Sequence, residues 1–294
     1  MFIYFTETLG GYTNMANIFS APVVELVELN NLFIELTAKN CNQRCKHCYI
    51  DFPISKNTKD FISIDKVKAA LFDTMHENIQ CIYLTGAEPM THPDFNSILR
   101  LCLKRASVCI CTNATFINEK KARFLKKVEE ESSHAIVFKF SIDHYNEIKN
   151  DDIRGRGAYR QAINAIKSIA KYNFTPILNI VNYYNEDEKT LISEFRNICK
   201  KIGLDSNDCN FQINEHHNKY KPTIVKSERS NENTDCRDGR VLTDRGVYVC
   251  PFLANDHRGR MGGDFKDYSK KMYLETDFCS TCAQNKAKIF GLNY

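Results

Sequence analysis

Short apolar runs alternate along the chain with longer segments in which apolar residues recur every three or four positions. Short runs bounded by turn residues are typical of buried strands, and the longer spacing is typical of amphipathic helices. The predicted strands are 32–37, 81–84, 108–111, 135–140, 176–181 and 209–213. Six strands that alternate with helices through short loops predict an α/β fold with a parallel sheet, either doubly wound or rolled into an open barrel.

A helix is predicted after each of the first five strands. Ser63 is a suitable N-cap for the first helix, and the second is predicted from about 93 to 104. The apolar residues at helical spacing are Val67, Leu71 and Met75; Phe95, Ile98, Leu99 and Cys102; Ala122, Leu125 and Val128; Tyr159, Ala162, Ile163, Ile166 and Ile169; and Leu191, Ile192, Phe195, Ile198 and Ile202.

The two ends of the chain do not follow this rhythm. Residues 23–27 suggest a short strand or a cover over the bottom of a barrel. Residues 218–235 are polar and irregular, as in a linker or an exposed loop, and residues 246–251 look like a hairpin strand. We expect three parts: a cover segment at 1–31, a barrel at 32–217 and a cysteine-rich extension at 218–294.

Composition narrows the class of protein. A chain of 294 residues with 43% apolar residues can bury a proper core. The net charge of +4, from 40 basic and 36 acidic residues, does not suggest a general affinity for nucleic acid or membrane. No run approaches the length of a membrane span, and the N-terminus lacks the basic region of a secretory signal. We expect a cytoplasmic protein without nucleic-acid or membrane partners.

Thirteen cysteines is a high number for this length. In a reducing cytoplasm such a number points to metals rather than disulfides. Six of the cysteines lie in apolar stretches, where a free cysteine behaves as a small core residue. These six are Cys81, Cys102, Cys109, Cys111, Cys199 and Cys209. The other seven are candidate metal ligands.

Three of the candidate ligands, Cys41, Cys45 and Cys48, lie within eight residues directly after the first predicted strand. Three thiolates can hold three irons of a cubane cluster and leave the fourth iron open for another ligand. A structural zinc site, with His47 or a distant residue as the fourth ligand, is the alternative.

Polar residues also follow the later predicted strands, where the chemistry of parallel sheets collects. They are Glu88, Thr112, Ser141 and Asp143. Asp143 either binds a ligand or caps the following turn, and Arg154 competes with Arg156 for a binding role. The sequence leaves open whether Glu215, His216 and His217 face a substrate or form a solvated loop.

Taken together, these motifs resemble the radical S-adenosylmethionine (SAM) superfamily over about 32–213. The family signature C-x3-C-x-aromatic-C is similar to the segment from Cys41 to Cys48, with His47 in the aromatic slot. Its Gly-Gly-Glu-Pro motif is similar to Gly86-Ala87-Glu88-Pro89, and two further regions are similar to Thr112-Asn113 and to Ser141-Ile142-Asp143 with Arg154-Gly155. Ala87 and Ala114 stand where the family often has glycine; both are small.

The resemblance implies a partial (β/α)6 TIM-like barrel in which SAM binds the open iron of a 4Fe-4S cluster. A carboxylate such as Glu88 suits the ammonium group of SAM, and Arg154 suits its carboxylate. The implied cofactor-binding residues are His47, Gly86, Ala87, Glu88, Thr112, Ser141, Asp143 and Arg154. No catalytic acid or base is predicted.

The C-terminal cysteines resemble the SPASM and Twitch extensions of the same family, which hold auxiliary clusters. The four cysteines are Cys236, Cys250, Cys279 and Cys282. The resemblance implies a second 4Fe-4S cluster, and four protein thiolates would leave it no open iron, so that it would serve electron transfer. A closed zinc ribbon satisfies the same spacing.

The function implied is reductive cleavage of SAM to a 5′-deoxyadenosyl radical that abstracts hydrogen from a substrate carbon, with an oxidation favoured by the auxiliary cluster. The implied partners are a small-molecule or peptide substrate and a flavodoxin- or ferredoxin-type electron donor. The short segment before the first strand leans towards a small molecule or a short protein segment. The alternatives are a non-enzymatic zinc-binding adaptor and a SAM-binding regulatory partner.

Overall fold

The computed structural model describes residues 23–50, 58–205, 208–216, 235–273 and 279. Within these ranges no helix is long and apolar enough to cross a membrane.

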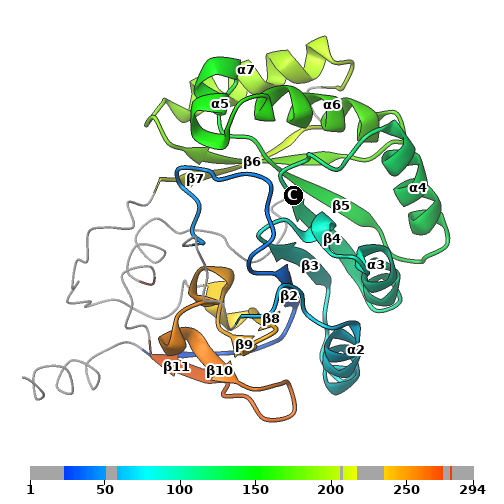
Figure 1. The fold of residues 1–294 in the computed structure, drawn as a ribbon, viewed down its shortest axis with the longest axis vertical. Coiled ribbons are helices and arrows are strands. Elements are labelled where there is room, and N and C mark those ends of the chain that lie inside the picture. The colour runs from blue at the N-terminus through cyan, green and yellow to red at the C-terminus, as the bar shows by residue number, and fades with distance from the viewer. Residues whose placement is uncertain (1–22, 51–57, 206–207, 217–234, 274–278, 280–294) are drawn as a thin grey trace, which may run out of the picture.

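A nine-stranded, mostly parallel sheet forms the centre of the molecule (Figure 1), in the order β10-β9-β8-β2-β3-β4-β5-β6-β7. Its six middle and upper strands are β2 (Asn31–Thr37), β3 (Cys81–Gly86), β4 (Ser107–Thr112), β5 (Ile136–Ser141), β6 (Pro176–Asn182) and β7 (Asn210–Glu215). They pair in parallel in chain order. All six predicted strands are confirmed, as is the α/β class with a parallel sheet.

Within the described residues, six α-helices connect these strands or follow them along the outer side of the curved sheet (Figure 1). They are α2 (Ile64–Asp73), α3 (Phe95–Leu103), α4 (Glu119–Glu130), α5 (Glu147–Arg154), α6 (Ala158–Ala170) and α7 (Glu188–Lys201). Ser63 caps α2 as predicted, since its side chain accepts from the backbone N–H of Lys66 at 3.2 Å. Helix α5 was not predicted, because it is mostly polar and its Ile148 is exposed.

From residue 235 onward the chain rejoins the main sheet, and the linker predicted at 218–235 lies outside the described residues except for residue 235. Strand β8 (Gly239–Thr243) lies parallel to β2 at the edge of the six-stranded array, and β9 (Gly246–Tyr248) and β10 (Arg260–Gly262) continue it in antiparallel fashion. The hairpin strand predicted at 246–251 is thus confirmed. Short 3-10 turns accompany these elements: η1 (Pro89–Thr91), η3 (Asp235–Arg237), η4 (Pro251–Leu253) and η5 (His257–Gly259).

The short strand predicted near the N-terminus is also present. It is β1 (Val23–Glu25), and it pairs antiparallel with β11 (Lys271–Tyr273) in a separate two-stranded sheet. This pairing brings the first and last described strands side by side (Figure 1).

One prediction about the cysteines is wrong. Cys199, at the end of α7, and Cys209, just before β7, form a disulfide rather than two free core thiols. The disulfide joins two residues that are ten positions apart in the sequence. Among the other four, Cys81, Cys102 and Cys109 are buried free thiols as predicted, and Cys111 is half-buried.

Candidate functional site

A cavity of about 270 Å³ lies at the carboxyl ends of the parallel strands. The parallel order explains the position, because it brings the loops after β2, β3, β4 and β5 to one edge of the sheet. Ten of the residues predicted for the N-terminal cluster and SAM line it: Cys41, Cys45, His47, Cys48, Gly86, Ala87, Glu88, Thr112, Ser141 and Arg154. Asp143 is absent from the lining.

Gly86 is small for a reason that the sequence does not show. Its φ is +124°, and a Cβ added to it would lie 2.3 Å from the backbone oxygen of Thr37. The next residue, Ala87, donates its N–H to that same oxygen at 2.7 Å. Gly86 therefore lets the loop after β3 lie directly against the end of β2, where the cysteine loop begins.

Glu88 is fully buried and joins two of the loops. One carboxylate oxygen accepts from the Thr112 hydroxyl at 2.8 Å and from the Met90 N–H at 3.1 Å, and the other accepts from the Asn113 N–H at 2.8 Å. Burial raises the pKa of Glu88 to about 7, against the lowering effect of these donors. All three donors are neutral, so an ammonium group in the cavity would complete the site and favour the ionised carboxylate.

Asp143 is absent from the cavity lining but contacts three residues that line the cavity. Its Oδ2 lies 2.6 Å from His47 Nε2, its Oδ1 accepts from Arg154 Nη2 at 3.1 Å, and the Val181 N–H donates to Oδ1 at 2.9 Å. Burial by itself would raise the pKa of Asp143, but Arg154 and His47 outweigh it and hold the pKa at about 2. Asp143 therefore positions residues of the cavity wall, among them the His47 and Arg154 side chains.

Hydrogen-bond donors from the cysteine loop itself, from the loop after β4 and from α5 are directed at sulfur atoms of the cysteine loop. Cys41 Sγ accepts from the Gln43 N–H at 3.4 Å and from Asn113 Nδ2 at 3.7 Å. Arg154 Nη1 lies 3.7 Å from Cys45 Sγ. Such donors stabilise thiolates that bind metals. Burial raises the pKa of Cys41, and that of Cys45 to about 11, so a metal is needed to deprotonate these thiols.

Three thiols of one loop fit the ligand set of a cubane cluster. A cubane takes each thiolate on a different iron. Three half-buried thiols along one loop, all lining one cavity, provide that arrangement. His47, a fourth ligand considered for zinc, is paired with Asp143 instead.

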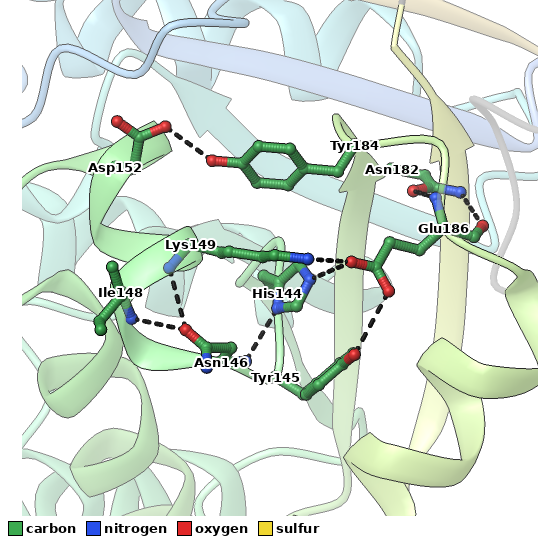
Figure 2. A network of polar contacts seen from close by, with 9 residues as sticks. All are labelled: His144, Tyr145, Asn146, Ile148, Lys149, Asp152, Asn182, Tyr184 and Glu186. Atoms are coloured by element: carbon green, nitrogen blue, oxygen red, sulfur yellow. Dashed lines mark hydrogen bonds and ion pairs between the residues drawn. The ribbon is translucent and has the colours of Figure 1, made fainter.

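A polar network fixes the loops beside the cavity, and the sequence did not reveal it (Figure 2). Glu186, between β6 and α7, forms ion pairs with His144 Nε2 at 2.9 Å and with Lys149, and accepts from the Tyr145 hydroxyl at 3.3 Å. These contacts come from the loop after β5 and from α5. Hydrogen bonds from Lys149 and His144 lower the pKa of Glu186 to about 2.

Helix α5 also binds the cysteine loop. The Lys46 N–H donates to the backbone oxygen of Ile153 at 3.0 Å, and Lys46 Nζ lies 2.6 Å from Asp152 Oδ1. The other oxygen of Asp152 accepts from the Tyr184 hydroxyl at 2.6 Å. The helix therefore connects the cysteine loop to the loop after β6, and it carries Arg154 at its last residue.

Several residues of the cavity wall were not predicted from the sequence: Tyr49, Lys139, Asn179, Gln212, Asn214 and Phe252. The available signal was polar residues inside otherwise apolar strands, such as Lys139 in β5 and Asn179 in β6. His216, whose role was open, lines the cavity, and its ring centroid lies 4.5 Å from that of Tyr183. His217 lies outside the described residues.

The C-terminal cysteines are only partly described. Cys236, Cys250 and Cys279 are buried, and Cys282 lies outside the described residues. The guanidinium of Arg240 is buried beside this region and donates to the backbone oxygen of Cys236 at 2.7 Å. The second metal site stays a prediction.

The fold and the site thus define the class of protein. It is an α/β protein with a parallel sheet, in which a cysteine loop lies over a cavity at the strand ends. The radical SAM superfamily matches residues 36–196, which is more than half of the chain. The chain belongs to this superfamily. Membership implies that the chain is an enzyme that carries out SAM-dependent radical chemistry with a 4Fe-4S cluster.

Individual curated relatives are distant from this chain in sequence. The antilisterial bacteriocin subtilosin biosynthesis protein AlbA of Bacillus subtilis is 28% identical over 163 residues, which cover 54% of this chain and 33% of AlbA. The GTP 3′,8-cyclase of Tolumonas auensis is 23% identical over 263 residues, covering 85% of this chain and 73% of the cyclase. The match spans about a third of the length of the first curated relatives.

A solved structure, native anSMEcpe with bound AdoMet, superimposes with a TM-score of 0.63 at 15% identity. The match covers 89% of this chain and 84% of that one. At this identity the likeness concerns the fold alone.

Proposed function

We propose that the chain is a radical SAM oxidoreductase or maturase that abstracts hydrogen from a carbon of a small molecule or peptide. In this proposal residues 32–217 form a partial (β/α)6 barrel, and residues 218–294 form a Twitch- or SPASM-like extension. The observation that carries the proposal is the common cavity, because it combines three thiols of one loop with strand-end residues from β3, β4 and β5.

When bound through Cys41, Cys45 and Cys48, a 4Fe-4S cluster supplies the electron that cleaves SAM to methionine and a 5′-deoxyadenosyl radical. The chain's own residues bind SAM and orient it. Glu88 accepts the ammonium group of SAM, which suits a buried carboxylate among neutral donors. Arg154, held by Asp143, is aimed at the cavity and at Cys45, where it faces the carboxylate of SAM.

The extension would hold the second 4Fe-4S cluster through Cys236, Cys250, Cys279 and Cys282. Burial of the three described thiols supports this, because a cluster with four thiolate ligands needs no access to substrate. Such a cluster, held by these four cysteines, would supply a one-electron acceptor, so an oxidation of the substrate is the favoured reaction. Electrons would come from a flavodoxin- or ferredoxin-type donor in the cytoplasm.

Metal analysis and SAM cleavage test the proposal together. After anaerobic reconstitution we expect about eight iron per chain, the content of two cubane clusters. With a reductant the protein should produce 5′-deoxyadenosine from SAM. About two zinc and no iron would instead establish a zinc-binding adaptor. Iron and SAM binding without any 5′-deoxyadenosine, under every reductant tried, would favour a SAM-binding regulatory protein.

A further inference from the structure

The inner face of the sheet becomes polar towards β5, β6 and β7. Side chains alternate between the two faces of a strand, so in β5 Phe138 and Phe140 share one face while Lys139 and Ser141 share the other. Ser141 pairs in register with Asn179 of β6, whose side-chain oxygen accepts from Asn214 Nδ2 at 3.1 Å. Lys139, Ser141, Asn179 and Asn214 all line the cavity.

Lys139 is the unusual member of this group. It is 7% exposed, yet within the described ranges its ammonium group has no ion pair and no hydrogen bond. Its Nζ lies over the face of the Tyr83 ring, 5.5 Å from the ring centroid. A cation over an aromatic ring gains modest energy, whereas a buried lysine without a carboxylate partner is costly. A cavity-lining ammonium in this state calls for an anion.

The position of Lys139 separates it from the residues proposed for SAM. It precedes Ser141 by two residues on the same face, so it lies about 7 Å farther from the carboxyl end of β5. Arg154, which faces the carboxylate of SAM in the proposed function, is the last residue of α5, and its Nη1 lies 3.7 Å from Cys45 Sγ. An anion at Lys139 is therefore a group of a second ligand.

We infer that Lys139 binds an oxyanion of the substrate, a carboxylate or a phosphate, deep in the cavity. The carboxamides of Asn179 and Asn214 supply further polar contacts on the neighbouring strands. The substrate class is thus an acidic small molecule or a peptide that inserts a carboxylate side chain or terminus. The inference rests on the proposed function for the identity of this ligand as substrate.

Bromide is a suitable probe, because it is an anion that can be located by anomalous scattering. In crystals of the SAM-bound protein soaked in bromide, we expect a peak in hydrogen-bonding contact with Lys139 Nζ. Acetate or inorganic phosphate, added in turn, should displace it, and the effective competitor identifies the oxyanion. The absence of a peak in the wild type would overturn the inference. Displacement by neither competitor would also overturn it and leave an adventitious ion only.

Two variants test whether the anion binds through the positive charge of Lys139. Lys139→Met should lose the peak, and Lys139→Arg should keep it. Lys121→Met is the matched control, because Lys121 also lies over aromatic rings, at 5.2 Å from Phe95 and 5.3 Å from Phe124, but outside the cavity. It should keep the bromide at Lys139. A peak that survives in Lys139→Met would overturn the inference.

Equilibrium dialysis with SAM shows whether the carboxylate that Lys139 binds belongs to SAM or to the substrate. Lys139→Met should bind SAM within about threefold of the wild type, because a lost charge-assisted hydrogen bond to SAM would weaken binding by about tenfold or more. Such a tenfold loss would assign Lys139 to SAM and overturn the inference. Bromide at Lys139 in a wild-type protein that forms no 5′-deoxyadenosine would refute the proposed function but leave the anion site standing.

Discussion

Arg154 Nη2 donates to Asp143 Oδ1 at 3.1 Å while its Nη1 lies 3.7 Å from Cys45 Sγ. One buried guanidinium therefore links the loop after β5 to the cysteine loop. The pairing with Asp143 fixes the orientation of Arg154 before any ligand binds, which reduces the entropy that binding costs.

Arg154→Lys tests this orientation. A lysine keeps the charge but loses the planar donor group, so we expect SAM affinity to fall by about tenfold or more. Equilibrium dialysis measures the affinity, and thermal unfolding reports whether the variant is folded. Arg156→Lys is the matched control, because Arg156 is exposed and two residues away. Weaker SAM binding in Arg156→Lys than in Arg154→Lys would reverse the assignment.

The two cysteine groups should have different roles. Cys45→Ala should abolish 5′-deoxyadenosine formation and lower iron by about four per chain, because three thiolates hold the first cluster. Cys279→Ala should spare SAM cleavage yet block product formation. Cys102→Ala, in the core of α3, serves as the control and should retain all the iron. Equal loss of cleavage in Cys45→Ala and Cys279→Ala would contradict this division.

Glu88 should make the metal-free chain less stable as pH rises. Its pKa is about 7 when folded and 4.5 ordinarily, so between these values the folded chain holds a proton that the unfolded chain releases. The free energy of unfolding therefore falls as pH increases through this window, by up to about 3 kcal/mol from this group.

Urea unfolding at pH 5 and pH 7.5 measures this dependence. Glu88→Gln should remove most of the difference between the two pH values. Glu130→Gln, an exposed position on α4, should leave it unchanged. If Glu88→Gln shows the wild-type slope, the carboxylate is ionised at pH 5 and the buried site is wrongly described.

Gly86→Ala should destabilise the site. The added Cβ would lie 2.3 Å from the Thr37 oxygen at a φ of +124°, so both a clash and backbone strain oppose it. We expect a loss of about 2 to 4 kcal/mol in the free energy of unfolding. Gly203→Ala is the control for strain alone, because its φ is +86° and nothing lies within 4 Å of the added Cβ. Equal losses in both variants would show that the contact with Thr37 yields easily.

The sequence by itself determined the strands, most of the helices and the composition of the cysteine loop. Apolar periodicity reflects which residues are buried, and this is a local property that survives without knowledge of the fold. The segment Cys41 to Cys48 and the Gly86-Ala87-Glu88-Pro89 motif were equally readable, because each depends on neighbouring residues. Ser63 capped its helix for the same reason.

Only the tertiary structure decided how distant segments meet. Strand β8 pairs with β2, and just before β8 the Asp238 backbone oxygen accepts from Asn31 Nδ2, 207 positions away in the sequence. No local pattern encodes such a partner. The disulfide of Cys199 with Cys209 and the withdrawal of Asp143 behind Arg154 have the same origin. In the sequence, Lys139 is a single charged residue within an otherwise apolar predicted strand. Its direction into the cavity follows from strand alternation combined with a sheet that the sequence alone could not assemble.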